Sequence, residues 1–298
     1  MPRTNQAPKT KLFVEGRYRK LSRDLPQTVF FCPDCKGHPR RRRGCERCEG
    51  FGKLTRDSVQ ELVGWVVGRG FGTRKHKFHG AGREDVDVRM LGRGRPFVME
   101  LIDPKVTDPD LAALEALVND RNAGRLEVQG LHWSEKGRVR ILKETQQAKA
   151  YQARVAMLGE PSADKIASLL SERFTLAQNT PQRVAHRRAD LVRERWVELR
   201  EVRPSVEADL ENDPTSERRE LAAGETEWMV SVATQHGTYV KEFISGEDGR
   251  TEPSLAQMLE VESCTCLDLD VLNILAEDGG ELEVTERPSP PPSFGAGI

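Results

Sequence analysis

The chain has 298 residues, which is enough for one large domain or two modest ones. Aromatic residues make up 6% of it and charged residues 31%, so leucine and valine must build most of the core. The net charge of −1 conceals an asymmetry, because residues 1–53 carry fourteen lysines and arginines against five acids. That excess indicates a polyanionic partner, most simply a nucleic acid. No stretch has the roughly 20 apolar residues of a membrane span, and no apolar signal core follows Met1, so we expect a cytoplasmic protein without membrane contact.

Two cysteine pairs follow an N-terminus of residues 1–12 that we expect to be disordered. Both are C-x₂-C pairs within a basic segment of residues 13–57, and they consist of Cys32, Cys35, Cys45 and Cys48. Four thiolates at this spacing supply a tetrahedral zinc site without an open position, so we predict a structural rather than a catalytic metal. Reactive or redox-active thiols are the alternative. The arginine run at residues 40–43 lies between the pairs and is suited to contact phosphate.

A segment rich in glycine and charge, HGAGREDVDVR at residues 79–89, is poor material for a core and well suited to a site. Val86 and Val88 alternate with Asp85 and Asp87, which predicts the start of a half-buried strand. An acid at such a junction, flanked by arginines, is a common way to present a catalytic carboxylate to an anionic substrate. A surface hairpin with a ladder of charges is the alternative.

Periodicity predicts helices and strands without the regular alternation of a parallel α/β fold, so the predicted class is α+β. The predicted helices cover residues 58–67, 108–121, 161–174 and 255–261, with Ser58 and Asp108 as N-caps of the first two. The predicted strands cover residues 95–102, 126–131, 139–142, 149–158, 228–233 and 267–275, with one or two more within 183–202. Acidic residues 204–223 are expected to form an exposed insertion, and residues 276–298 a disordered, acidic and proline-rich tail.

Four phrases, taken in order, resemble one family. They are GREDVDVRMLG with GRPF at residues 82–97, KAY at 149–151, TPQRVAHRRAD at 180–190, and GTYVKEF with GRTEPS at 237–254. The chain resembles the archaeal and eukaryotic tRNA pseudouridine synthases that act on uridines 54 and 55 of the TΨC arm. The resemblance covers about residues 13–275. It implies a catalytic fold over residues 58–275, with a mixed, largely antiparallel central sheet flanked by helices, preceded by the small zinc module.

The resemblance also implies roles for single residues. Asp85 corresponds to the essential aspartate of these enzymes, and Asp87 is its rival, because periodicity does not separate the two. Tyr151 corresponds to the tyrosine that stacks on the target base and assists proton removal at C5. Lys241 corresponds to the cation that pairs with the catalytic aspartate, and Tyr239 supports the pocket. The reaction breaks the N1–C1′ bond and forms a C5–C1′ bond without net redox change, so no catalytic cofactor is expected.

Further contacts with the tRNA substrate are expected from arginines and one histidine. These residues are Arg17, Arg83, Arg183, His186, Arg187 and Arg188. For His186, a structural hydrogen bond is the alternative, and a lone histidine among arginines does not favour a metal ligand.

One departure from the family concerns substrate binding. Its members usually carry an N-terminal accessory RNA-binding domain related to THUMP modules, whereas this sequence starts almost at the catalytic region. We therefore expect that function to be lost, to reside on a separate RNA-binding subunit, or to be taken over by the cysteine module. Two other classes stay open: a non-catalytic, zinc-containing RNA-binding protein or RNA chaperone, and an interaction module similar to the zinc region of DnaJ-type chaperones.

Overall fold

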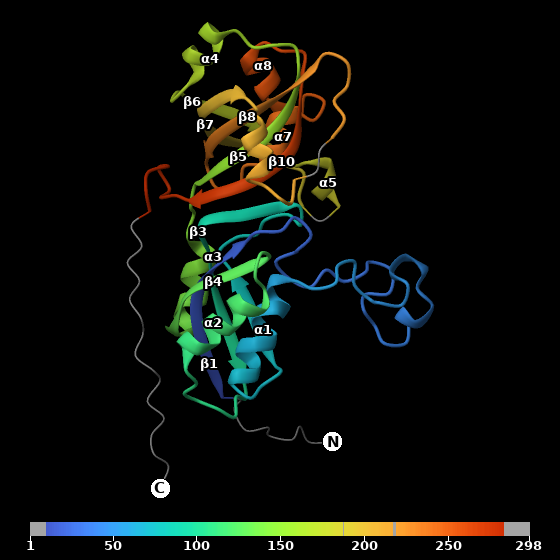
Figure 1. Cartoon of the computed structure of the whole chain (residues 1–298), viewed down its shortest axis with the longest axis vertical. Helices are drawn as coiled ribbons and strands as arrows, with labels where there is room; N and C mark the ends of the chain where they lie inside the picture. The colour runs from blue at the N-terminus through green and yellow to red at the C-terminus, as the bar shows by residue number, and fades with distance from the viewer. Residues whose placement is uncertain (1–9, 187, 217–218, 283–298) are drawn as a thin grey trace. The chain divides into compact units, whose positions relative to one another are not determined.

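The computed structural model describes residues 10–186, 188–216 and 219–282 (Figure 1). Contacts divide the chain into two compact units. Among the described residues, the first unit holds those up to Asp87 together with Arg93–Thr145. The second unit holds Val88–Gly92 together with residues 146–282. Each unit combines strands with helices, which confirms the predicted α+β class.

The first unit is a small sheet with three helices. Its elements are the strands β1 (Lys11–Lys20), β2 (His76–Gly80), β3 (Val88–Ile102, from Arg93 onward) and β4 (Leu126–Ser134), the 3₁₀ turns Arg42–Gly44 and Glu46–Cys48, and the helices α1 (Val59–Gly70), α2 (Leu111–Arg121) and α3 (Lys136–Glu144). The strand order is β4-β1-β3, with β2 on β3. The pairs β1–β4 and β2–β3 are antiparallel. Side chains along β1 alternate between the two faces, which turns Tyr18 and Lys20 into the interior.

The second unit is a larger sheet. Its strands are the first five residues of β3, β5 (Lys149–Leu158), β6 (Arg173–Gln178), β7 (Arg193–Pro204), β8 (Glu225–Thr234), β9 (Thr251–Glu252) and β10 (Ser263–Ile274), in the order β3-β10-β5-β8-β7-β6-β9. Its helices are α4 (Ala163–Leu169), α5 (Gln182–Ala185), α6 (Glu207–Glu211), α7 (Val240–Ser245) and α8 (Leu255–Leu259). Only β3 and β10 pair in parallel among the strand pairs described in this unit, so the predicted largely antiparallel sheet is confirmed.

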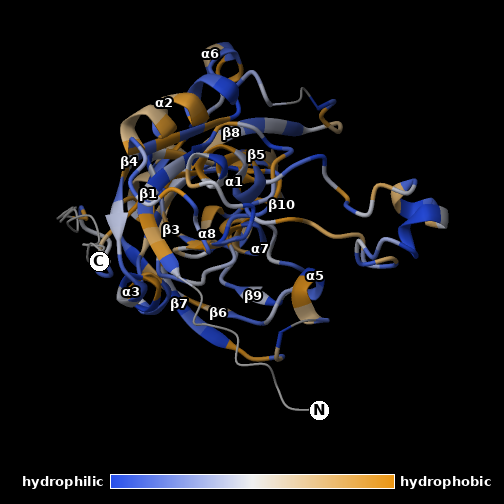
Figure 2. Cartoon of the chain, turned by 90° about the horizontal axis from the view of Figure 1, so that it is seen from below, coloured by the Kyte–Doolittle hydropathy of each residue, from blue (hydrophilic) through white to orange (hydrophobic). Residues whose placement is uncertain are grey.

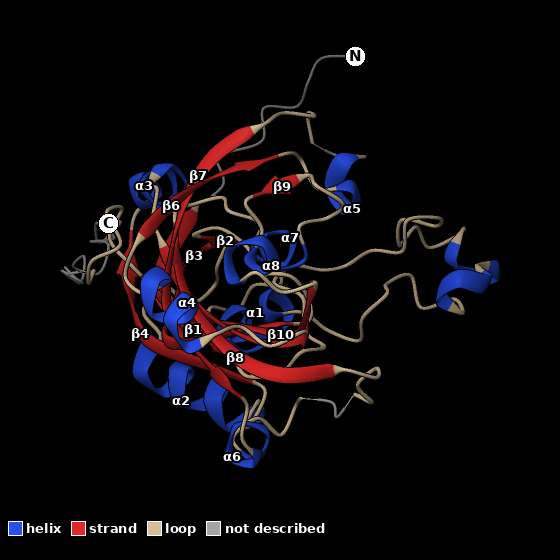
Figure 3. Cartoon of the chain, turned by 90° about the horizontal axis from the view of Figure 1, so that it is seen from above, coloured by secondary structure: helices blue, strands red, loops and turns tan. Residues whose placement is uncertain are grey.

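Helices cover the strands within each unit. In the first unit, α1 and α2 contact each other and α2 packs on β4. Figure 2 colours α2 largely as hydrophobic, although Val118 is its only fully buried residue among those described. In the second unit, α7 and α8 lie side by side and both contact β10 (Figure 3). Within the described residues, no helix has the length and apolar character that a membrane crossing requires.

Several predicted elements are confirmed closely. Strand β5 runs from Lys149 to Leu158, as predicted. Ser58 is the N-cap of α1, because its side chain accepts a hydrogen bond from the Glu61 amide at 3.3 Å. The N-cap of α2, however, is Asp110 and not Asp108.

The prediction of a strand at residues 139–142 is wrong, because these residues lie within α3. Val139 and Ile141 alternate as on a strand, whereas Val139 and Leu142 are spaced as on one face of a helix, so this short segment suits both. Arg140 pairs with Glu144 one turn later at 2.9 Å, and Arg138 pairs with Glu15 of β1 at 2.6 Å. The second of these ion pairs joins residues far apart in the sequence, so a local pattern does not reveal it. The predicted helix at residues 161–174 is also too long, since α4 ends at Leu169 and is followed by β6.

The acidic insertion at residues 204–223 contacts the sheet of the second unit. Asp213 is 7% exposed and pairs with Arg89 at 2.7 Å. Ser216 donates a hydrogen bond to Asp268, and that carboxylate also binds the buried Arg154. At the ends of the chain, β1 already begins at Lys11. Residues 1–9 and 283–298, which hold most of the two termini expected to be disordered, lie outside the described residues.

A substitution at Gly92 tests how closely β3 packs against β10. It has a φ of +53°, and a Cβ atom there would lie 2.0 Å from the carbonyl oxygen of Leu272. We expect Gly92→Ala to lower the free energy of unfolding by roughly 2–4 kcal/mol, because it adds a backbone clash to a strained φ. The matched control is Gly124→Ala, where φ is +75° but no atom lies within 4 Å. It should cost only about 1 kcal/mol. Urea denaturation measures both, and equal losses would contradict the clash.

Candidate active site

A loop of residues 81–87 joins β2 to β3 and carries the acids singled out in the sequence. Strand β3 begins at Val88, so the expected strand across residues 85–88 starts later than predicted. Asp85 and Asp87 therefore lie in the loop and do not share a strand face. Asp85 is half-buried, whereas Asp87 is exposed. The two candidate carboxylates therefore differ in their exposure to solvent.

Glu84 is the buried carboxylate of this loop. It pairs with Arg95 at 2.7 Å, and the two side chains are 0% and 1% exposed. The hydroxyl of Tyr18 donates to both carboxylate oxygens of Glu84, at 2.8 and 2.9 Å. Burial and the Glu84 carboxylate raise the pKa of Tyr18, so the phenol keeps the proton that it donates. Gln27 in turn donates to the Tyr18 hydroxyl at 2.8 Å.

The main chain of the loop is held by side chains at several points. Arg95 donates to the carbonyl of Ala81 at 2.7 Å, and Gln27 donates to the carbonyl of Gly82 at 2.9 Å. Lys20 binds the carbonyls of Asp85 and Val86, and Arg23 binds that of Asp87 at 3.1 Å. All these donors come from β1, β3 or the segment after β1. The loop is therefore fixed in the first unit before any ligand binds.

Lys20 binds two of the carbonyls of this loop. Its ammonium group is fully buried and donates to the carbonyls of Leu25, Asp85 and Val86, at 2.8, 2.9 and 2.8 Å. Three N–H donors thus meet three acceptors. Burial lowers the pKa of Lys20 to about 8, although the charges of Glu84 and Asp87 oppose that shift. The group therefore stays charged at neutral pH.

Tyr151 and Lys241 both belong to the second unit. Tyr151 is half-buried on β5, where it faces Val271 of β10 and Val232 of β8 across the ladder. Lys241 is half-buried in the first turn of α7, which Tyr239 caps. The chain turns into a helix at Val240, so Lys241 lies on α7 and Tyr239 immediately precedes it.

Two residues position the start of α7. The amide side chain of Gln178, 1% exposed, accepts from the Tyr239 amide at 2.8 Å and donates to the Tyr239 carbonyl at 3.0 Å. Arg183 pairs with Glu242 at 2.5 Å and lies 5.9 Å from the centre of the Tyr239 ring. The predicted contacts Arg183 and Tyr239 are therefore neighbours. Sequence patterns did not reveal Gln178 or Glu242, since both act across more than fifty residues.

The other predicted RNA contacts differ in exposure. Arg83, His186 and Arg188 are exposed, and Arg187 lies outside the described residues. Arg17 is half-buried and donates to the carbonyls of Arg93 and Gly94, at 2.7 and 2.9 Å. Arg17 therefore uses two of its N–H donors in hydrogen bonds that join β1 to β3.

The four cysteines of the two C-x₂-C pairs come together. Their sulfur atoms all lie within 4.8 Å of one another, with Cys32 and Cys45 3.7 Å apart and Cys35 and Cys48 3.6 Å apart. Four ligands at about 2.3 Å from a tetrahedral zinc ion would lie roughly 3.8 Å apart. The cluster thus fits a metal ion bound by four thiolates. Cys264 is buried outside this cluster, and burial raises its pKa to about 12, as expected for an inert thiol.

A family model described as "Pus10, C-terminal" matches residues 13–275. The chain belongs to this family. The match coincides with the predicted extent of the resemblance, which is confirmed. It spans the cysteine cluster, the acidic loop and the predicted positions Tyr151 and Lys241.

Curated relatives in archaea agree with this membership. A protein of Methanopyrus kandleri, named tRNA pseudouridine synthase Pus10, is 41% identical over 273 residues, which are 90% of this chain and 57% of the relative. The protein of that name from Halorubrum lacusprofundi is 42% identical over 269 residues, 89% of this chain and 58% of the relative. The chain thus spans a little over half the length of these relatives.

Among solved structures, the chain is similar to one in "Crystal Structure of a Cbf5-Nop10-Gar1 Complex". The identity is 15% and the TM-score 0.35, over 72% of this chain and 45% of that chain. This likeness is too low to inform the function.

A substitution at Lys20 tests how the loop of residues 81–87 is held in place. We expect Lys20→Met to lower the free energy of unfolding by roughly 2–4 kcal/mol, because it leaves three carbonyls without their donor. The control is Lys105→Met, which removes an exposed lysine from the same unit and should change stability by less than about 0.5 kcal/mol. Thermal and urea denaturation measure both variants. Equal stability of the Lys20→Met variant and the unchanged chain would refute the role assigned to Lys20.

Proposed function

We propose that the chain converts uridine to pseudouridine in the TΨC arm of tRNA, at position 54, 55 or both, with Asp85 as the essential aspartate. Membership of the family supports the reaction, and the half-buried position of Asp85 in the immobilised loop of residues 81–87 is the observation that favours it over the exposed Asp87. A carboxylate that acts on a reacting atom must be held in place before the substrate arrives. Asp85 belongs to a loop whose main chain is bound on both sides, and it is half-buried where Asp87 is exposed.

The chemistry needs a carboxylate and no redox partner. The N1–C1′ bond breaks, the base rotates, and C5 forms a bond to C1′. C5 then loses its proton, and N1 gains one. Asp85 either attacks C1′ or removes a proton to form a glycal, and both routes start from the ionised side chain. A nearby cation stabilises that ionised form, which is the role proposed for Lys241.

The uridine must leave the structured arm before it reacts. Enzymes that act on a base extrude it and stack it on a flat side chain, a role that suits Tyr151. Tyr239 is proposed to support the same pocket, since Gln178 fixes its main chain and Arg183 lies over its ring. Arg83, His186, Arg187 and Arg188 are proposed to contact the RNA backbone, together with Arg17 and Arg183.

The cysteine module is proposed to bind zinc and to contact the RNA. Phe30, Phe31 and Phe51 are 40%, 55% and 52% exposed, and the arginines at residues 40–43 are exposed beside them in the module. Exposed aromatic rings next to cations are typical of surfaces that bind single-stranded nucleic acid. This surface also favours a second candidate function, a non-catalytic RNA-binding protein of the cytoplasm, which would share the tRNA partner but lack the reaction.

A tRNA modification assay separates the two functions. We expect the chain to form pseudouridine in an unmodified tRNA transcript. Asp85→Asn should reduce the rate by a factor of roughly 10³ or more while tRNA affinity is kept, because the variant loses only the reacting carboxylate. Chemical mapping of pseudouridine gives rate and position together.

Asp87→Asn is the matched control, since it removes an acid two residues away that is exposed. It should leave the rate close to that of the unchanged chain. An inactive Asp87→Asn variant beside an active Asp85→Asn variant would reverse the assignment. A folded chain that binds tRNA without modifying it would favour the non-catalytic function.

Elemental analysis tests the zinc site. The purified chain should hold about one zinc ion, and Cys35→Ser should remove most of it, because a tetrahedral site needs all four ligands. Cys266→Ser is the control, since Cys266 lies outside the cluster. A chelator should make residues 32–48 sensitive to protease. Equal zinc content in the two serine variants would count against the site.

A further inference from the structure

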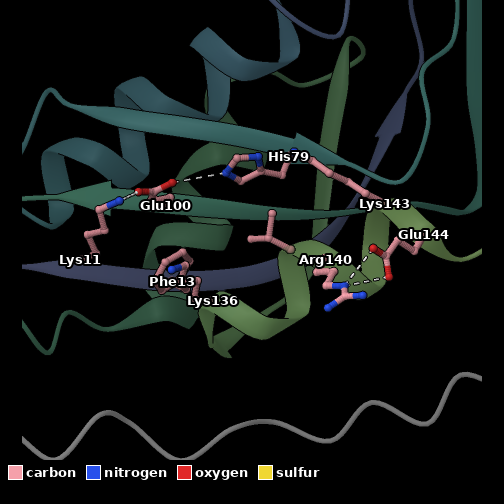
Figure 4. A pocket seen from close by; sticks show the side chains of 9 residues that line it. Lys11, Phe13, His79, Glu100, Lys136, Arg140, Lys143 and Glu144 are labelled. Atoms are coloured by element: carbon pink, nitrogen blue, oxygen red, sulfur yellow. Dashed lines mark hydrogen bonds and ion pairs between the residues drawn. The ribbon is translucent and has the colours of Figure 1, made fainter.

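A pocket of about 380 Å³ lies in the first unit between α3 and the sheet (Figure 4). Strand β1 contributes Lys11 and Phe13, β2 contributes His79, and β3 contributes Glu100. The volume falls in the range of roughly 300–1,000 Å³ that is usual for small-ligand sites. No residue of this pocket takes part in the contacts that hold the loop of residues 81–87.

The inner wall of the pocket is polar and buried. Glu100 is 6% exposed and pairs with Lys11 at 2.5 Å. Burial acts to raise the pKa of Glu100, whereas the hydrogen bond and the charge of Lys11 act to lower it. The net pKa lies below its ordinary value, so the carboxylate is ionised. Burial and the charge of Lys143 lower the pKa of His79, which is therefore neutral at pH 7. Its buried Nε2 atom lies 3.5 Å from the Glu100 carboxylate (Figure 4).

The rim of the pocket is cationic. Helix α3 presents Lys136, Arg140 and Lys143 there, all exposed. Arg140 is neutralised by Glu144, one turn along the helix at 2.9 Å. Neither Lys136 nor Lys143 forms an ion pair with any residue that the structure describes, so the rim keeps two uncompensated positive charges.

The lining between wall and rim is apolar. Phe13 and Val139 face the pocket and are half-buried. A free inorganic anion would bind the lysines, but the apolar lining would stay in contact with water. A nucleotide matches both parts, since its phosphate suits the lysines and its base or ribose suits an aromatic ring.

The pocket and the loop network use opposite faces of the β2–β3 hairpin. Lys77 lies across from Glu100 and His79 across from Val98, which places these side chains on the pocket face. Phe78 lies on the other face and contacts the ring of Tyr18, which belongs to the network around Glu84. A ligand in the pocket would leave that network undisturbed, and β2 leads directly into the loop of residues 81–87.

We propose that this pocket binds one nucleotide of the RNA substrate, with its phosphate on Lys136 and Lys143 and its base or ribose against Phe13 and Val139. The proposal rests on the proposed tRNA substrate and adds a second RNA contact to it. The occupant anchors the RNA to the unit that carries Asp85, at a point separate from the reacting uridine.

The test is a double variant, Lys136→Gln with Lys143→Gln, against a matched control, Lys105→Gln with Arg121→Gln. Both remove two exposed positive charges from the first unit, so they change net charge equally. Fluorescence anisotropy with a tRNA transcript should show affinity about tenfold weaker for the pocket variant at ~0.1 M salt, with a salt slope smaller by about one to two. The control should bind like the unchanged chain. The rate at saturating tRNA should be kept.

Phe13→Leu keeps an apolar side chain in place and removes the ring. It should weaken tRNA binding by roughly fivefold through lost stacking. Uridine 5′-monophosphate should compete with tRNA for the unchanged chain better than inorganic phosphate does, and this advantage should disappear in the Lys136/Lys143 variant.

The outcomes keep this proposal apart from the proposed function. Equal tRNA affinity of the two double variants overturns the pocket, whether or not the chain forms pseudouridine. A selective loss of affinity in a chain that forms no pseudouridine supports the pocket and rejects the enzyme. Equal competition by phosphate and uridine 5′-monophosphate reduces the site to a general anion site and overturns the nucleotide assignment.

Discussion

The buried ion pair between Glu84 and Arg95 fixes the acidic loop on which the proposed reaction depends. Both side chains are almost fully shielded from water, where an uncompensated charge is very costly. Removal of one partner from such a pair costs about 3–5 kcal/mol, whereas replacement of both by apolar groups is often neutral. The pair therefore contributes less to stability than to position. Arg95 also binds the carbonyl of Ala81, so one guanidinium group holds both the entry and the centre of the loop.

Two adjacent acids in this loop have opposite environments. Glu84 points into the unit, where Arg95 balances its charge and the Tyr18 hydroxyl donates a hydrogen bond to it. Asp85 is half-buried, and Lys20 binds its main-chain carbonyl. The loop is therefore held through the Glu84 side chain and through main-chain carbonyls, including that of Asp85. This division explains why a segment so rich in charge is stable without a hydrophobic core of its own.

Structural features that depend on neighbouring residues could be predicted from the sequence. Features that depend on contacts between residues far apart in the sequence could not. Strand β5, the N-cap Ser58 and the cysteine cluster follow from alternation, capping and ligand spacing within a few residues. The structural role of Glu84 depends on Tyr18, 66 residues away, and no periodicity reveals it. The same holds for Gln178, which binds Tyr239 across 61 residues. The family resemblance indicated the candidate residues, but their local geometry depends on contacts between residues far apart in the sequence.

The acidic insertion at residues 204–223 shows why composition alone misleads about burial. An acidic stretch suggests a solvated loop, yet Asp213 is buried because Arg89 needs a second carboxylate beside Asp270. A guanidinium group presents five donors in a fork, so one carboxylate does not saturate it. Arg89 belongs to the five residues with which β3 enters the second unit. The insertion thus completes the charge balance at the strand that follows the acidic loop, and loss of Asp213 would leave part of a half-buried arginine without its partner.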